Sequence, residues 1–343
     1  MKSALPGFTL GLRSTLICSM ATLFISGSGA AAADTTFHWG VVGHDDHDIY
    51  DNTYVYNKNS FEEQMHLITG SSMSWLRTSC NSASCNKLLT TAEAGGVQIL
   101  KSIEMSPDSK LDEEANYKRA YASGVTEGSA YVYGFKYFEA GDELDNWVGM
   151  KGDGSQRSQY VESRYLQARG FVRGMIDGIH SVDASAKVLV DDAGWCHYGF
   201  LRMLWDDGVR WDITAFHWYN NEGNIEKAGC NNANVAQIHA AFGPPVWITE
   251  YNSNTAVSKN DPVAEGAWIG TFIAQLRTVA PKYNIQAAFA YELFDEPNLV
   301  SPISHYGIFY ANGSPKFAIG PMIKGTSTSS SQIPAPPSSI RVD

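Results

Sequence analysis

Glu143 lies among other acids in the segment "YFEAGDELDNW", which runs from Tyr137 to Trp147. Asp142 and Asp145 flank it, and like charges this close together raise the free energy of every ionised carboxylate. A segment that only connected two structural elements would gain little from this arrangement. A carboxyl group that keeps its proton near neutral pH, as a general acid must, gives the cluster a chemical purpose.

A second glutamate stands where it could work with the first. Glu250 closes the apolar run "VWITE", at the end of a strand candidate. Cleavage of a glycosidic bond needs a proton donor for the leaving oxygen and a second carboxylate on the other side of the anomeric carbon. Glu143 and Glu250 fit these two roles. The alternative for Glu250 is a buried glutamate paired with an arginine or a tyrosine, since glutamate is seldom buried without a partner.

Short apolar runs alternate along the chain with helical patterns. One helical pattern is "SFEEQMHLI", in which Ser60 and Glu63 have the spacing of a capping box, and two longer ones begin near Tyr160 and Ala264. Eight strand–helix units predict an α/β fold, a (β/α)8 TIM barrel in a single catalytic domain over residues 34–324. An open doubly wound sheet is the alternative, but no glycine-rich phosphate loop follows the first strand. The expected strands are residues 36–43, 74–79, 97–105, 133–141, 187–194, 212–219, 245–252 and 286–294.

Such a barrel would bring the polar residues at its strand ends to one face, where barrels of this kind carry their active sites. Carboxylates bind hydroxyl groups and transfer protons, and aromatic rings stack on the apolar faces of pyranose rings. Their combination therefore favours a sugar substrate. The strand-end residues are Arg77, Glu104, Asp142, Glu143, Asp191, Asp192, Trp195, His217, Trp218, Tyr219, Glu250, Tyr251, Glu292, Asp295 and Glu296.

The motifs "EAGDELDN" and "WITEYN" in this order resemble those of the retaining clan-A glycoside hydrolases, which include families 5 and 39. The resemblance extends to "WLRTS", "FHWY" and "HYGIFYANGSPKFA". It implies that Glu143 is the acid/base and Glu250 the nucleophile. Arg77 would hold Glu250 ionised through charge-assisted hydrogen bonds. His217 and Tyr219 would orient Glu250 or contact the sugar, although either ring could instead belong to the barrel packing.

Asp142 departs from the clan pattern, which usually has Asn before the acid/base. In that clan the Asn commonly bonds the sugar 2-hydroxyl, whereas an ionised Asp can only accept a hydrogen bond. We expect Asp142 to contact the substrate and to raise the pKa of Glu143 by its negative charge. A raised pKa would keep Glu143 protonated near neutral pH. The alternative is that Asp142 pairs with a neighbouring arginine or lysine.

Further residues are expected to line the sugar-binding cleft. Trp147, Trp195 and Trp218 are candidate platforms for sugar rings. Glu292 and Asp295 stand where many clan members carry a tryptophan platform after the eighth strand, and we expect both to contact the substrate. The usual substrates of those families are therefore not carried over to this chain.

The segment "GHDDHD" raises the question of a metal site, because imidazole and carboxylate groups are suitable ligands. Residues 44–48 are too close together in the sequence to define a coordination geometry, and adjacent side chains point in different directions. A sugar-binding loop or a solvated turn fits better. We predict no metal and no cofactor.

The N-terminal segment has the parts of a secretory signal peptide. Lys2 and Arg13 make a basic start, "STLICSMATLFISG" is apolar, and "GAAAAD" offers a cleavage site before Asp34. We therefore expect residues 1–33 to be removed and the protein to be secreted or periplasmic. The apolar run is too short for a good membrane span.

Four cysteines follow Asp34, and an even number is typical of disulfide bonding in an oxidising compartment. Three pairings are possible. We favour Cys80–Cys85 and Cys196–Cys230, because each bond would close a local loop. Free buried thiols are the alternative.

The composition is that of a globular protein, with 44% hydrophobic and 18% charged residues. Residues 1–33 carry two bases and no acids, so their removal lowers the net charge from −11 to −13. This acidity disfavours nucleic acid and anionic lipid as partners. We expect a monomer that binds a carbohydrate, with a disordered Ser/Pro-rich tail over residues 325–343.

Together these features predict a secreted retaining glycoside hydrolase that cleaves O-glycosidic bonds of a poly- or oligosaccharide by double displacement. A non-catalytic carbohydrate-binding protein on a degenerate barrel is the main alternative, with Asp142 as one sign of decay. Metal-dependent deacetylation through residues 44–48 is a third hypothesis. The sequence does not identify the sugar, the linkage or the endo or exo mode of cleavage.

Overall fold

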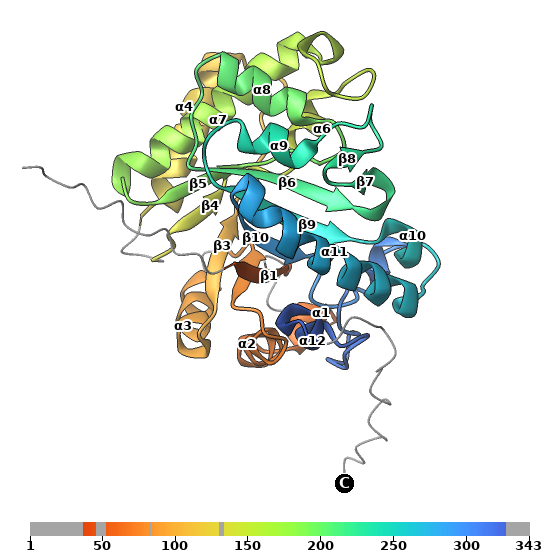
Figure 1. Cartoon of the computed structure of the whole chain (residues 1–343). Coiled ribbons are helices and arrows are strands. Elements are labelled where there is room, and N and C mark those ends of the chain that lie inside the picture. The colour runs from red at the N-terminus through yellow and green to blue at the C-terminus, as the bar shows by residue number, and fades with distance from the viewer. Residues whose placement is uncertain (1–36, 46–52, 82–83, 130–133, 327–343) are drawn as a thin grey trace, which may run out of the picture. The chain divides into compact units, whose positions relative to one another are not determined.

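Eight parallel strands close into a barrel in the computed structural model, which describes residues 37–45, 53–81, 84–129 and 134–326 (Figure 1). Around the barrel the neighbours follow the order β1-β10-β9-β6-β5-β4-β3-β2. All eight predicted strands are confirmed, and so are the (β/α)8 TIM barrel and the single domain. The strands are β1 (His38–Val42), β2 (Trp75–Thr78), β3 (Gln98–Ser102), β4 (Tyr137–Glu139), β5 (Lys187–Val190), β6 (Ile213–Tyr219), β9 (Val246–Asn252) and β10 (Ile285–Ala290).

Helices cover the outside of the barrel (Figure 1). The predicted capping box is present, because the Ser60 hydroxyl accepts from the backbone of Glu63 and the Glu63 carboxylate accepts from the backbone of Ser60. The two longer predicted helices are α7 and α11. The described helices are α1 (Val55–Lys58), α2 (Phe61–Gly70), α3 (Cys85–Gly95), α4 (Glu113–Glu127), α6 (Leu144–Val148), α7 (Glu162–Val182), α8 (Tyr198–Asp206), α9 (Val235–Ala240), α10 (Asn254–Val257), α11 (Pro262–Tyr283) and α12 (Ile319–Lys324).

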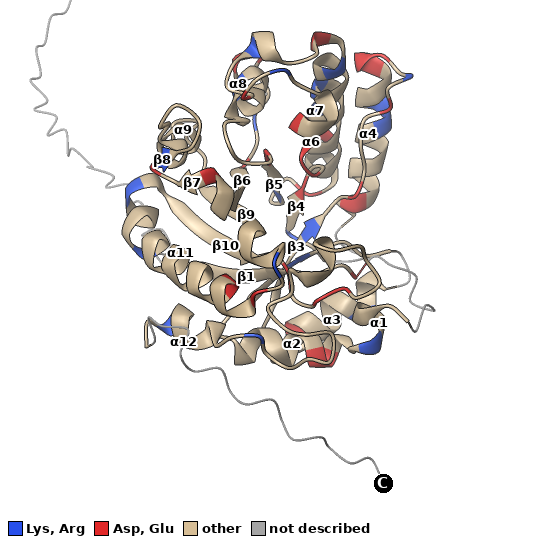
Figure 2. Ribbon diagram, turned by 90° about the vertical axis from the view of Figure 1, so that its right-hand side faces the viewer, with Lys and Arg blue, Asp and Glu red and all other residues tan. Residues whose placement is uncertain are grey.

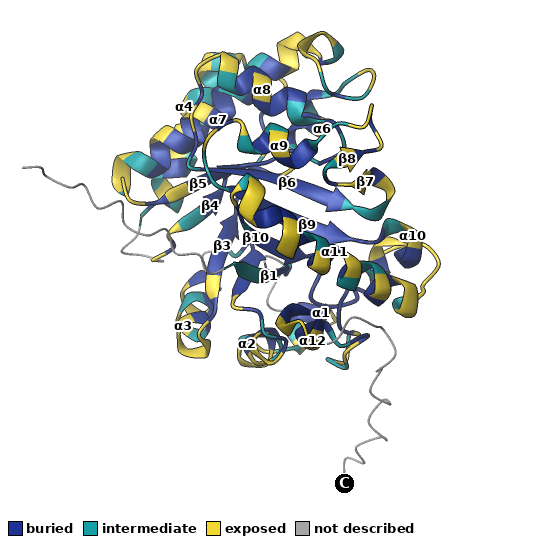
Figure 3. Cartoon of the chain, in the orientation of Figure 1, coloured by how far each residue is buried: buried dark blue, intermediate teal, exposed yellow. Residues whose placement is uncertain are grey.

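Most residues of the barrel strands are buried (Figure 3), as expected for parallel strands with a filled interior and an outer layer of helices. Every residue of β9 is buried. Inside the barrel, the rings of Trp75 and Trp247 lie 5.1 Å apart and those of Trp247 and Phe289 lie 5.9 Å apart. Trp75 and Trp247 stand near the starts of their strands. This aromatic layer therefore fills the barrel beneath the polar side chains at the opposite strand ends.

Helices α4 and α7 pack closely along a row of glycines. Gly170, Gly174 and Gly178 recur every fourth residue of α7 and therefore share one face. A methyl group on any of them would come within 2.2–2.3 Å of a backbone carbonyl oxygen of α4. The missing side chains let the two backbones approach each other. Since α4 precedes β4 and α7 follows it, this contact supports the strand that leads to Glu143.

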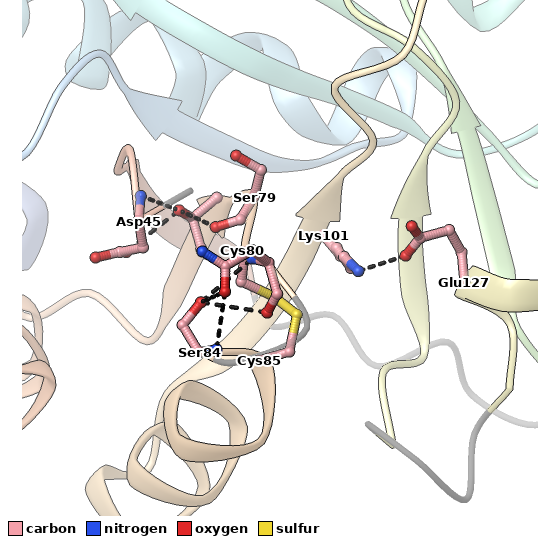
Figure 4. The surroundings of a disulfide bond; sticks show 9 residues. Asp45, Ser79, Cys80, Ser84, Cys85, Lys101 and Glu127 are labelled. Atoms are coloured by element: carbon pink, nitrogen blue, oxygen red, sulfur yellow. Dashed lines mark hydrogen bonds and ion pairs between the residues drawn. A yellow bond between two sulfur atoms is a disulfide. The ribbon is translucent and has the colours of Figure 1, made fainter. Parts of the chain in front are cut away.

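Both predicted disulfides are present. Cys80–Cys85 has a Cα–Cα distance of 5.2 Å and closes a loop directly after β2, beside Ser79 and Ser84 (Figure 4). Cys196–Cys230 has a Cα–Cα distance of 6.1 Å. It joins the loop after β5 to the longer loop after β6, which contains the hairpin of β7 (Gly223–Asn224) and β8 (Lys227–Ala228).

Three sequence predictions fall on residues outside the described ranges. They concern the signal peptide over residues 1–33, the tail from residue 327 onward and residues 46–48 of the acidic and histidine-rich segment. Helix α12 ends at Lys324, and Gly325 caps it with a φ of 73°. None of the helices in the described ranges has the length and apolarity that a membrane crossing requires.

We predict that Gly174→Ala destabilises the protein by about 1–3 kcal/mol, because the added methyl group would meet the Tyr117 carbonyl oxygen at 2.2 Å. Urea unfolding followed by circular dichroism measures this change. Gly70→Ala is the matched control, since nothing lies within 4 Å of a methyl group at this last residue of α2. Alanine favours the helix there, so its effect should be neutral or slightly stabilising. Equal effects of both variants would contradict the close helix contact.

Candidate active site

The strands of the barrel end at one face, which is turned towards the viewer in Figure 2. A cavity of about 290 Å³ opens there. Its walls come from the loops after the barrel strands, where a TIM barrel carries its active site. The lining residues are Val42, Gly43, His44, Arg77, Thr78, Ser79, Ser102, Glu104, Asp142, Tyr291, Glu296 and Leu299.

Arg77 on β2 holds three carboxylates at this face. Its Nε donates to Glu139, the last residue of β4, in a very short contact. Its Nη2 donates to Asp142 at 2.5 Å, and its Nη1 donates to Glu250 at 2.8 Å. Burial would lower the pKa of Arg77, but the three negative charges raise it well above the usual range. The guanidinium therefore fixes the positions of Asp142 and Glu250 relative to each other, and the predicted contact with Glu250 is present.

Glu250 lies near the end of β9, with little freedom to move. Arg77 binds its Oε1, and the Tyr219 hydroxyl donates to its Oε2 at 2.5 Å. Burial raises the pKa of Glu250 despite the opposing positive charges of His217 and Arg77. Burial and the charge of Glu250 also raise the pKa of Tyr219 well above its ordinary value, so Tyr219 keeps its proton and remains a donor. Tyr219 thus orients Glu250, as one of its predicted roles required.

Glu143 stands on a loop beyond β4. Its backbone has φ 46° and ψ 45°, a conformation that is uncommon outside glycine and concentrates at functional sites. Its N–H donates to Asp191 at 3.1 Å, and Asn146 donates to its Oε2 at 2.8 Å. His217 contacts its Oε1 at 2.9 Å. The carboxylate is therefore held by Asn146 from α6 and His217 from β6, and the backbone of Glu143 by Asp191 from the loop after β5.

His217 on β6 connects the two glutamates. Its Nδ1 lies 2.9 Å from Oε1 of Glu143 and 3.5 Å from Oε2 of Glu250. One imidazole nitrogen therefore lies against both carboxylates and holds them close to each other. Burial would lower the pKa of His217, but the charges of Glu250 and Glu143 raise it well above its ordinary value.

The prediction of a raised pKa for Glu143 is wrong. Burial would raise the pKa of Glu143, but the hydrogen bonds from His217 and Asn146 outweigh it and lower the pKa to about 2. Asp142 instead pairs with Arg77, which was the alternative interpretation. Its side chain is still 41% exposed and lines the cavity, so contact with a substrate stays a prediction.

Trp218 is not available as a sugar platform. It is fully buried, its indole N–H donates to the Gly223 carbonyl at 3.3 Å, and its ring packs against Phe216. Successive residues of a strand face opposite sides, so Trp218 points to the outer helices when His217 and Tyr219 point inward. Trp147 and Trp195 are half-buried on α6 and on the loop after β5. Neither lines the cavity, and their binding roles remain predictions.

The two acids expected after the eighth strand do not face the cavity. Asp295 accepts from Lys316 Nζ at 3.1 Å and from the Gly307 N–H at 3.0 Å. It therefore belongs to an interior ion pair, which corrects its predicted substrate role. Glu292 is fully buried and accepts from the Tyr56 hydroxyl at 3.2 Å. Glu292 reaches the cavity only through His44.

His44 and Asp45 point in different directions, as expected for adjacent residues. His44 Nδ1 lies 3.2 Å from both Glu292 and Glu296, whereas Asp45 accepts from Gln64. Burial would lower the pKa of His44, but the two carboxylates raise it to about 10. His44, Glu292 and Glu296 could offer three metal ligands within 4.8 Å of one another. Here they form an ion-pair group, and the prediction of no metal remains a prediction.

Sequence analysis assigned no role to Glu139 or Tyr291. Glu139 had a usable signal, because an acid within the apolar run "YFEAG" needs a buried cation, and Arg77 ends a neighbouring apolar run. Tyr291 follows β10 and lines the cavity, but nothing distinguished it from the many other tyrosines. His44 was considered only as a possible metal ligand and Glu296 only as a strand-end residue, since no pattern indicated that they would pair.

Glu222 connects two loops at the same face. It closes the short turn after β6, and its Oε2 accepts from the backbone N–H of Trp195 at 3.1 Å. Burial raises the pKa of Glu222 to about 8. The loop that carries Trp195 is therefore held by a carboxyl group that stays protonated when buried.

Comparison with known proteins identifies part of this architecture. Residues 190–298 match the family model described as the glycosyl hydrolase catalytic core. This segment contains Glu250, His217 and Tyr219. No curated protein sequence matches the chain. The family match confirms the glycoside hydrolase class predicted from the sequence.

Solved glycosidases share the fold. A GH53 catalytic domain from Ignisphaera aggregans is 12% identical with a TM-score of 0.58, over 76% of this chain and 88% of its own. A family 39 glycoside hydrolase from Bacteroides cellulosilyticus is 13% identical with a TM-score of 0.61, and the match covers 84% of this chain and 64% of that protein. A family 1 β-glucosidase from Thermotoga maritima is 10% identical with a TM-score of 0.55, and the match covers 84% of this chain and 98% of that protein. At such identities these structures establish the barrel, and they agree with the predicted clan-A resemblance.

We predict that Glu222→Gln reduces the pH dependence of stability. The folded carboxyl group has a pKa of about 8, whereas an unfolded glutamate titrates near 4.3. Between these values the folded state binds more protons than the unfolded state, so stability falls as the pH rises. In urea unfolding from about pH 5 to pH 8, the free energy of unfolding of the variant should rise relative to that of the parent as the pH increases. Parallel curves for the two proteins would contradict a protonated Glu222.

Proposed function

We propose that this chain, which carries a glycoside hydrolase catalytic core, is a secreted retaining enzyme that uses Glu250 as its nucleophile and Glu143 as its acid/base. The observation that carries this proposal is the His217 bridge between the two carboxylates. It brings both carboxylates to one imidazole nitrogen, which favours the close pair of a retaining enzyme, about 5–5.5 Å apart, over the wider pair of an inverting one, which must admit a water molecule.

In the first half of the reaction, Oε2 or Oε1 of Glu250 attacks the anomeric carbon of the sugar. The bond from this carbon to the leaving oxygen breaks, and Glu143 gives that oxygen a proton. Arg77 and Tyr219 orient the nucleophile from either side. Because both donors are already in place, attack requires no rearrangement of the groups around Glu250.

His217 supplies the proton that Glu143 needs. The pKa of Glu143 is about 2 and that of His217 is raised, so the proton they share at 2.9 Å resides on the imidazole. A sugar bound over Glu143 covers its exposed part, and the loss of water raises the pKa of a carboxylate. Substrate binding therefore moves the proton from Nδ1 of His217 to Oε1 of Glu143, from which it passes to the leaving oxygen.

The second half of the reaction reverses these roles. Glu143, now ionised, takes a proton from a water molecule, and the water oxygen attacks the anomeric carbon of the glycosyl-enzyme. The bond to Glu250 breaks, and the sugar leaves with its original anomeric configuration. The proton returned to Glu143 is again shared with His217, which restores the starting state.

A carbohydrate-binding protein without turnover is the second candidate. The low pKa of Glu143 favours it, because an acid ionised near neutral pH cannot donate a proton unless its environment changes. This candidate requires that the sugar binds without moving the proton from His217. It predicts binding of an oligosaccharide that is never cleaved.

Secretion is part of the proposal. It is supported by the basic and apolar N-terminal segment and by two disulfides, which persist in oxidising compartments. The partner that we propose is a poly- or oligosaccharide, bound by a monomer.

We predict that Glu250→Ala and Glu143→Ala each abolish the release of new reducing ends from a panel of glycans, because each variant lacks one of the two groups that double displacement needs. Glu93→Ala on the exposed face of α3 is the matched control and should retain full activity. Reducing-end release by the parent names the substrate class. A parent that binds an oligosaccharide without cleaving it would favour the second candidate.

We also predict that the first product released has the anomeric configuration of the substrate. Proton NMR recorded during hydrolysis, before mutarotation, distinguishes the two anomers. Methanol added as a competing acceptor should give a methyl glycoside of the same configuration, since a glycosyl-enzyme can react with either alcohol or water. An inverted product would exclude Glu250 as a nucleophile.

A further inference from the structure

The cavity at the strand ends has more negative than positive charge. Its charged lining groups are the carboxylates of Glu104, Asp142 and Glu296 and the cations Arg77 and His44. Arg77 is shared among three carboxylates, and His44 is shared between two. Neither cation is therefore left to bind an anionic substrate, whereas a cationic one would reduce the charge imbalance.

Asp142 is the acid of the Arg77 group that a ligand can reach. Its side chain is 41% exposed, whereas Glu139 and Asp191 are buried. Only one of its oxygens, Oδ1, is held by Arg77 Nη2. Asp142, His217 and Glu250 have ligand atoms that all lie within 4.8 Å of one another. The Asp142 carboxylate therefore stands beside the nucleophile and faces the cavity.

This position selects one part of a bound sugar. A sugar attacked by Glu250 has its anomeric carbon at bonding distance from the nucleophile and therefore near Asp142. The ring neighbours of that carbon are the ring oxygen, which cannot donate a hydrogen bond, and the next ring carbon, whose substituent can donate one to the Asp142 carboxylate. A hydroxyl group there could donate one hydrogen bond, whereas an ammonium group could donate up to three and would neutralise the carboxylate. A charge-assisted hydrogen bond is also about twice as strong as a neutral one.

We propose that the enzyme acts on 2-amino-2-deoxy sugars whose amino group is free, and that Asp142 determines this specificity by binding the ammonium group. The inference rests on the proposed function, because it requires Glu250 as the nucleophile. An N-acetylated sugar lacks the positive charge and adds bulk beside Arg77. A uronide brings a further negative charge into the cavity.

The test compares kcat/KM for aryl glycosides of 2-amino-2-deoxyglucose and 2-amino-2-deoxygalactose with those of the parent hexoses and the N-acetylated sugars, in both anomers. The parent enzyme should prefer the free amine. In Asp142→Asn the ratio of amine to hydroxyl efficiency should fall at least about 30-fold, as loss of one partner of a close charge pair implies. Asp206→Asn at the end of α8 removes the same charge from the surface and should leave the ratio unchanged.

The pH dependence gives a second readout that a structural role of Asp142 would not change. The preference of the parent for the amine should fall as the pH rises through the pKa of the sugar ammonium group, because the neutral amine no longer binds the carboxylate more strongly. In Asp142→Asn this dependence should be lost. Circular dichroism and thermal unfolding establish that both variants are folded.

Equal or better cleavage of the neutral or N-acetylated sugars by the parent would overturn the proposal, as would an unchanged ratio in Asp142→Asn. The proposed glycosidase activity would stand in either case, since cleavage itself tests that activity. If neither these glycosides nor the glycan panel is cleaved, the proposed function fails, and calorimetric titration with glucosamine and glucose then tests the ammonium site alone. A preference for glucosamine that Asp142→Asn removes would support the ammonium site, whereas equal binding or none would overturn it.

Discussion

The buried guanidinium of Arg77 is the constraint on which the face of the barrel depends. A cation taken out of water is stable only if its charge and its donors are matched, and Arg77 obtains this match from Glu139, Asp142 and Glu250. The three carboxylates in turn lie together because Arg77, with His217 beside it, offsets their charge. Barrel strands β2, β4 and β9 thus meet at one electrostatic centre, and the geometry of the site follows from the closure of the sheet.

His217 distributes the remaining charge. It approaches Glu143, Glu250 and Asp191, and it is the second cation among the acids around Glu250. The two glutamates receive opposite influences, because hydrogen bonds lower the pKa of Glu143 while burial raises that of Glu250. Such a division of two carboxyl groups by their surroundings is a feature of acid–base sites. The chemistry therefore depends on how a substrate changes these surroundings.

The barrel could be predicted from the sequence because each strand is a continuous apolar run, and the pairing of the cysteines because each bond closes a local loop. Arg77, Tyr219 and Glu250 could be placed for the same reason, since each lies at or near the end of such a run. The partner of Asp142 could not be predicted, because it lies 65 residues away and depends on barrel register. Trp218 was predicted to face the sugar, but it lies one residue from the inward-facing positions of its strand and therefore points outward. Asp295 was predicted to contact the substrate, because its actual partner, Lys316, lies beyond the last strand and could not be identified from the strand pattern.

The two glutamates differ in their mechanical support. Glu250 is part of a buried strand, whereas Glu143 belongs to the short segment from Gly141 to Asn146, where Gly141 has a φ of 91° and Glu143 itself is left-handed. Sequence changes in this segment can therefore shift Glu143, the proposed proton donor, while Glu250, the proposed nucleophile, keeps its place. In divergent evolution or in directed evolution, substitutions in that segment would let the site accept different leaving groups, and the barrel strands would stay unchanged.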